Sequence, residues 1–83
     1  MISTKGRYAL RVMIDLAGHE GEQYIPLKDV AARQGISKKY LEIIVRELVS
    51  GGLVSGVSGK GGGYRLCRAP EEYPIGEIIE RME

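Results

Sequence analysis

Apolar residues recur along the first part of the chain with the three-to-four-residue spacing of an α-helix. Between residues 3 and 19 one stripe of apolar positions consists of Tyr8, Ala9, Val12, Met13, Leu16 and Ala17. This spacing predicts a helix over about 3–19 with one buried face. Ser3 or Thr4 is the expected N-cap, and Gly18 marks the end. A second, shorter helix is expected over about 27–34.

The segment 38–50 has the clearest helical pattern in the chain. Its apolar residues fall at i, i+3, i+4 and i+7, which predicts one buried face: they are Leu41, Ile44, Val45 and Leu48. Gly35 is suited to reversing the chain before this helix, and Ser37 is suited to capping it. Two helices joined by a tight glycine-bearing turn are typical of a helix-turn-helix, in which the second helix reads DNA.

A β-hairpin is expected directly after the third helix. The stretch LVSGV has β character, a glycine-rich turn follows it, and YRLCR is the returning strand. A last helix over about 74–83 carries an apolar stripe that suits either the core or a subunit interface: Ile75, Ile78, Ile79 and Met82. The predicted fold is mainly α with a small β-hairpin, a single winged helix-turn-helix domain over residues 1–83 with its wing at about 53–67.

The loop SGKGGGY at 58–64 has three interpretations. A phosphate-binding P-loop needs GxxxxGK followed by Ser or Thr and then a helix, whereas here Lys60 precedes Gly61 and a strand follows. An ordinary hairpin turn is the second interpretation, although three consecutive glycines exceed what a turn needs. A wing that lies close to a sugar-phosphate chain fits best, since glycines permit close backbone approach and Ser58 and Lys60 offer a donor and a charge.

Charge is unevenly distributed although the net charge is only +1. Residues 33–68 carry seven Lys or Arg against two Glu, and residues 69–83 carry five Glu against one Arg. A basic middle next to an acidic tail indicates an anionic partner on one side of the molecule.

Several other kinds of chemistry lack the residues they need. His19 and Cys67 are the only histidine and the only cysteine, which argues against a metal site and excludes an internal disulfide. The sequence shows no nucleophile–base pair and no carboxylate dyad of the kind that an enzyme would need. Cys67 is expected to pack as a small apolar residue. The first apolar stretch is interrupted by Arg11 and Asp15, so it is neither a signal peptide nor a membrane span, and the single cysteine favours the cytoplasm.

Three stretches of the chain resemble the IscR/CymR/NsrR family of bacterial transcription regulators: STKGRYAL, LKDVAARQGISKKYLE and GLVSGVSGKGGGYRL. The final PIGEIIERME is similar to the helix that follows the wing in that family. The resemblance implies a winged helix-turn-helix that binds double-stranded DNA as a homodimer. It also implies a repressor of iron–sulfur, cysteine or redox-related genes.

The resemblance also assigns roles to the YLE positions. Tyr40 would touch the DNA backbone, Leu41 would belong to the core, and Glu42 would face base edges. Ser58 stands where relatives often carry an arginine that enters the minor groove. Family members continue into a long dimerisation helix, and those that bind a cluster carry three further cysteines there. Neither lies within these 83 residues, so no cofactor is expected in this chain, although a longer parent could hold an iron–sulfur cluster.

The residues expected to contact DNA are Lys5, Lys28, Ser37, Lys38, Lys39, Tyr40, Glu42, Ile43, Arg46, Ser58, Lys60 and Gly61. Lys38, Lys39 and Arg46 could simply form a solvated helix face, but their position on the groove-facing side of a helix-turn-helix favours contact with phosphate or bases. Glu42 can accept from cytosine N4 or pair with Arg46 one turn later, and Ile43 either contacts a thymine methyl group or is incidental. A winged helix that binds another protein instead of DNA is the alternative function.

Overall fold

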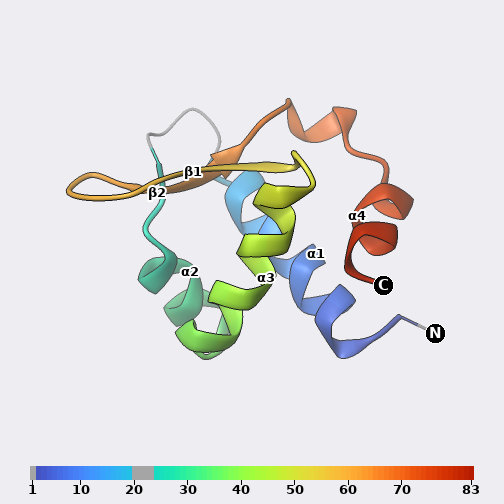
Figure 1. Ribbon diagram of the computed structural model, residues 1–83, viewed down its shortest axis with the longest axis horizontal. Helices are drawn as coiled ribbons and strands as arrows, with labels where there is room; N and C mark the ends of the chain where they lie inside the picture. The colour runs from blue at the N-terminus through green and yellow to red at the C-terminus, as the bar shows by residue number, and fades with distance from the viewer. Residues whose placement is uncertain (1, 20–23) are drawn as a thin grey trace.

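The computed structural model describes residues 2–19 and 24–83, which form four α-helices and one hairpin (Figure 1). The elements in chain order are α1 (Thr4–Ala17), α2 (Leu27–Gln34), α3 (Lys38–Ser50), β1 (Val54–Val57), β2 (Gly63–Leu66), the 3-10 turn η1 (Pro70–Glu72) and α4 (Ile75–Met82). This is the expected winged helix-turn-helix. The observed α1 is slightly shorter than the expected helix, and η1 was not foreseen.

Local sequence signals set the bounds of the helix-turn-helix. The Ser3 hydroxyl accepts from the Gly6 N–H at the start of α1, and the Ser37 hydroxyl accepts from the Tyr40 N–H at the start of α3. Gly35 ends α2 in the left-handed conformation at φ 65°, which a residue without a Cβ adopts at little cost. The chain therefore reverses within three residues, between the end of α2 at Gln34 and the start of α3 at Lys38.

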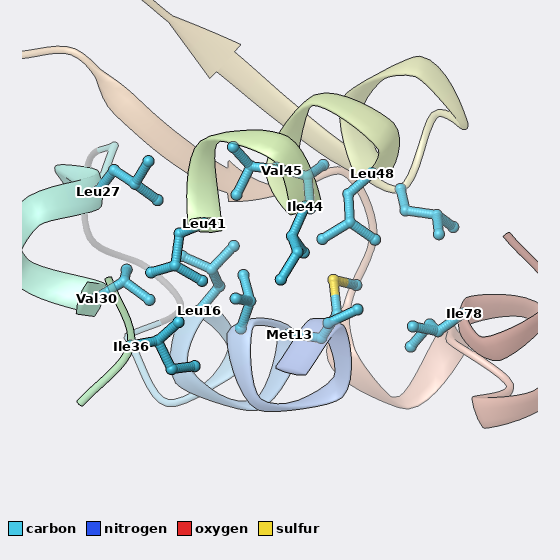
Figure 2. Close-up of a cluster of buried hydrophobic side chains, with 14 of the residues drawn as sticks. Met13, Leu16, Leu27, Val30, Ile36, Leu41, Ile44, Val45, Leu48 and Ile78 are labelled. Carbon is cyan, nitrogen blue, oxygen red and sulfur yellow. The ribbon is translucent and has the colours of Figure 1, made fainter. Parts of the chain in front are cut away.

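The core forms where the apolar faces of α1 and α3 meet, with α2 and α4 closing its two ends (Figure 2). Leu41, Ile44 and Leu48 of α3 are completely buried, and each such side chain contributes about 1.5–3 kcal/mol relative to an exposed one. Ile78 and Met82 of α4 are also buried. The face of α3 opposite these residues is left for solvent or a ligand.

One expectation about a single residue was wrong: Cys67 is exposed and does not pack as a small apolar residue. Strand β2 ends one residue earlier, at Leu66, and a bend follows there. The apolar stripe of the last helix was expected in the core or at a subunit interface; Ile78 and Met82 lie in the core, whereas Ile75 begins α4 and is 64% exposed. Within the described residues no helix has the length and apolar character needed to span a membrane.

Asp15 interrupts the apolar face of α1 and yet is buried. Arg33 of α2 donates to both of its carboxylate oxygens, at 3.0 and 2.8 Å, and the Gln34 side-chain amide donates at 2.8 Å. His19 lies beside it, with Nδ1 2.9 Å from the Asp15 carbonyl oxygen. This hydrogen-bonded cluster joins the end of α1 to the end of α2, just before the turn of the helix-turn-helix.

The hairpin pairs β1 with β2 in antiparallel register, from Val54 opposite Leu66 to Val57 opposite Gly63. A further bridge joins Ile25 to Tyr64 through two backbone hydrogen bonds of 2.9 Å. The base of the wing is thereby attached to the segment that leads into α2. Figure 1 shows the wing extending from the body on the side away from the two chain ends.

Candidate nucleic-acid interface

The outward face of α3 carries most of the residues expected to read DNA. Because Leu41, Ile44, Val45 and Leu48 hold the opposite face in the core, the exposed positions are fixed. Lys38, Lys39, Glu42, Ile43 and Arg46 are all exposed, and Ile43 is 47% exposed. Lys39 and Arg46 are seven residues apart and so lie along the same face.

The wing places its tip residues in solvent. Ser58, Lys60 and Gly61 are exposed in the turn between β1 and β2. The turn is closed by a hydrogen bond of 3.0 Å from the Gly62 N–H to the Gly59 carbonyl. A lysine and a hydroxyl on a narrow, nearly side-chain-free loop can approach a sugar-phosphate chain closely.

A hollow of about 660 Å³ lies between α3 and the wing. Its lining residues are Glu42, Arg46, Val49, Gly56, Val57, Ser58 and Tyr64. Three of the expected DNA contacts, Glu42, Arg46 and Ser58, therefore face one shared space although they come from two elements. We call this space the helix–wing hollow.

Glu42 and Arg46 do not pair with each other. Of the ion pairs formed by the described residues, none includes either side chain. The proposed i,i+4 salt bridge is therefore absent, and both charges are available to a ligand. A guanidinium suits phosphate or a guanine edge, and a carboxylate suits the amino group of cytosine.

Other expected contacts lie away from the hollow. Lys5 of α1 pairs with Glu47 of α3 at 2.8 Å, so in this structure its ammonium is used to join the two helices. Lys28 is exposed on α2. Tyr40 is half-buried, with its ring edge-on to Tyr8 at a centroid distance of 5.7 Å. Ser37 is engaged in capping α3.

Sequence reasoning missed Val49, Val57 and Tyr64 as lining residues of the helix–wing hollow. Val49 lies seven residues after Glu42, so the helical spacing could have found it. Val57 and Tyr64 gave no comparable signal, because only the register of the hairpin and its position over α3 bring them to this space.

The described residues do not fit a metal or an iron–sulfur cluster. Within the described ranges no three His, Cys, Asp or Glu side chains converge on one point. Iron–sulfur clusters are held by several cysteine thiolates, and Cys67 is the only cysteine in the sequence.

Comparison with known proteins gives one consistent result. The family model Rrf2, described as an iron-dependent transcriptional regulator, matches residues 2–83. The chain is 45% identical over 82 residues to the HTH-type transcriptional regulator IscR of Aliivibrio salmonicida, which covers 99% of this chain and 49% of that protein. The chain therefore spans about half the length of the curated relatives it matches.

Solved structures agree with the sequence comparison. IscR of T. potens superposes with a TM-score of 0.92 at 46% identity, over 100% of this chain and 61% of that one. CymR of B. subtilis, the global cysteine regulator, gives a TM-score of 0.95 at 43% identity, over 100% of this chain and 64% of that one.

Proposed function

Because this chain belongs to the Rrf2 family of transcriptional regulators, we propose that it is a sequence-specific DNA-binding domain. Helix α3 enters the major groove, and the wing lies on the adjacent backbone or in the minor groove. The observation that carries the proposal is the helix–wing hollow, where Glu42 and Arg46 of α3 face Ser58 of the wing. The family is one of regulators, which agrees with the absence of an enzyme's residues from the sequence.

Charge supports the same assignment. Lys38, Lys39 and Lys60 are exposed, and none of them forms an ion pair with another described residue. When lysines without a partner in the protein bind phosphates, counterions condensed on the DNA are released. This release supplies most of the sequence-independent affinity. The negative charge of Glu42 lowers the sequence-independent affinity for DNA. Its contribution to function must therefore be the discrimination between bases.

The relatives support a proposal for the role of the whole protein. We propose a homodimeric repressor that acts in the bacterial cytoplasm on genes of iron–sulfur, cysteine or redox metabolism. The described residues do not fit a cluster, so any iron dependence would need side chains other than theirs. Homodimerisation is supported by an apolar hollow of about 290 Å³ between α1, η1 and α4, beside which Ile14 and Ile75 are 70% and 64% exposed.

A protein-binding function is less well supported. Surfaces that bind proteins usually have an apolar centre with few charges, whereas the exposed face of α3 combines Lys39, Glu42 and Arg46. The exposed apolar side chains there, Ile43 and Val49, at 47% and 40%, lie among these charged residues and form no charge-free centre.

Two substitutions on α3 test the DNA-binding proposal. Lys39→Ala should weaken binding to an operator and to random duplex by the same factor, and should reduce the slope of log K against log salt by about 0.9. Glu42→Ala should instead narrow the ratio of operator to random affinity by about 5- to 150-fold, because it removes one base contact worth about 1–3 kcal/mol.

The measurement is fluorescence anisotropy at several salt concentrations, on an operator chosen by genomic fragment selection. Glu72→Ala, which removes an exposed acidic charge from η1, is the control and should leave the affinity ratio unchanged. If both α3 variants bind both duplexes as the unmodified chain does, α3 does not face DNA.

A further inference from the structure

The helix–wing hollow is lined by apolar as well as polar side chains. Hydrogen bonds to base edges would require only the polar ones. Val49 on α3 and Val57 on β1 are 40% and 47% exposed, and both line it. The polar lining residues are Glu42, Arg46, Ser58 and Tyr64, of which Arg46, Ser58 and Tyr64 carry side-chain donors. Two aliphatic side chains from different elements together with three hydrogen-bond donors indicate a ligand that is itself half apolar and half anionic.

We propose that the hollow is a channel for one sugar-phosphate strand of duplex DNA. Val49 and Val57 pack against deoxyribose, and the Tyr64 hydroxyl donates to a phosphate oxygen. The inference rests on the proposed DNA-binding function and extends it, because it assigns three residues to a specific part of the nucleic acid.

The geometry of B-DNA gives the first argument. Its major and minor grooves are separated by a single sugar-phosphate backbone, so a protein with a helix in one groove and a wing toward the other must straddle that strand. The space between helix and wing is then occupied by the strand itself. The hollow of about 660 Å³ lies between those two elements.

The chemistry along α3 gives the second argument. Glu42, Arg46 and Val49 follow one another along the helix at i, i+4 and i+7 and all line the hollow. A carboxylate repels phosphate, so the phosphate lies toward Arg46, and Glu42 is left at the base edges. Val49 then faces the carbon-bound hydrogens of the sugar, which a charged residue could not contact without losing hydration.

Tyr64 is held in place before any ligand binds. Its backbone forms the two hydrogen bonds to Ile25, and its ring covers Gly56, where a Cβ would lie 2.9 Å from the ring atom Cε1. Its hydroxyl has no hydrogen-bond partner among the residues described. A rigid aromatic side chain with an available donor loses little entropy on binding.

The apolar walls also predict a preference between DNA and RNA. A ribose in the channel would place its 2′-hydroxyl against valine methyl groups, where it finds no hydrogen-bond partner. One ribonucleotide at the channel position should therefore weaken binding, while ribonucleotides elsewhere in the operator should have little effect.

Tyr64→Phe tests the phosphate contact, because it removes one hydroxyl and keeps the ring over Gly56. It should weaken operator binding about tenfold, the effect of a hydrogen bond to a charged group. A scan with single uncharged methylphosphonates should find one phosphate at which the unmodified chain loses affinity and Tyr64→Phe loses much less. Tyr8→Phe, a hydroxyl deletion on α1 outside the hollow, should show the same methylphosphonate profile as the unmodified chain.

Val49→Thr and Val57→Thr test the apolar walls at almost constant volume. Either variant should bind all-DNA operator a few-fold less tightly and should tolerate a single ribonucleotide at the channel position better than the unmodified chain does. The channel is refuted if the duplex binds but no phosphate is coupled to Tyr64 and no ribose to either valine. If no duplex binds at all, the DNA-binding proposal fails and the channel fails with it.

Discussion

Asp15→Ala is expected to destabilise the domain by about 3 kcal/mol. The Asp15 side chain is only 2% exposed and is the common acceptor for Arg33 and Gln34, so alanine removes the group that joins the end of α1 to the end of α2. Breaking a buried ion pair by removing one partner costs about 3–5 kcal/mol. Arg33 is 37% exposed and keeps access to water, which places the cost at the lower end.

Urea unfolding followed by far-ultraviolet circular dichroism measures this cost. Asp29→Ala is the matched control, since it deletes the same side chain from the half-buried first turn of α2. There the carboxylate forms no ion pair with another described residue and interacts favourably with the helix dipole, so its loss should cost about 0.3–1 kcal/mol. Equal losses in the two variants would show that the Asp15 cluster does not hold the helices together.

Acid should act through the same carboxylate. Burial raises the pKa of Asp15, but hydrogen bonds from Arg33 and Gln34 and the nearby positive charges outweigh burial, and the pKa lies below its ordinary value. Its stabilising contribution is therefore complete above the unfolded-state pKa of about 3.9 and is lost as the pH falls through the lower, folded-state pKa. Unfolding free energies between about pH 2 and pH 5 should fall more steeply for the unmodified chain than for Asp15→Asn; parallel curves would contradict this.

Local signals in the sequence were sufficient for the helix-turn-helix but not for the contacts that hold it. The bounds of α2 and α3 coincide with the expected ranges, because Gly35 and Ser37 act through their own backbone and immediate neighbours. Asp15 was recognised only as an interruption of an apolar stretch. Its partner Arg33 is 18 residues away, and nothing in the spacing links the two before α1 and α2 are packed together.

The residues of the candidate site also divide into those that local sequence signals predicted and those that depend on tertiary packing. The exposed face of α3 followed from periodicity, which identified Lys39, Glu42 and Arg46. The ion pair of Lys5 with Glu47 could not be foreseen, because it depends on where the start of α1 passes α3. Tyr64 was missed for a related reason: a half-buried strand residue is usually assigned to the core, and only the register of the hairpin and its position over α3 bring Tyr64 to the hollow.

Gly63→Ala is expected to detach the wing from the body. Gly63 has φ 150°, and a Cβ on it would lie 2.2 Å from the Ile25 carbonyl oxygen. Real atoms cannot approach so closely, so β2 must move, and the neighbouring hydrogen bonds between Tyr64 and Ile25 must lengthen or break. Overpacking and an unfavourable φ each cost about 1–3 kcal/mol, so the total destabilisation should be about 3 kcal/mol or more.

The binding of DNA should decline together with stability, because a displaced wing no longer faces α3 across the helix–wing hollow. Two glycine variants separate the causes. Gly61→Ala has φ 77° but meets no atom within 4 Å, so it carries the conformational cost alone, about 1–3 kcal/mol. Gly76→Ala, inside α4 with open space around it, should stabilise the domain by up to about 1 kcal/mol. Thermal unfolding of all three variants distinguishes the causes, and operator binding is compared between Gly63→Ala and Gly76→Ala, because Gly61 is itself an expected DNA contact. If Gly63→Ala unfolds as Gly61→Ala does, the close approach to Ile25 is not what requires glycine at position 63.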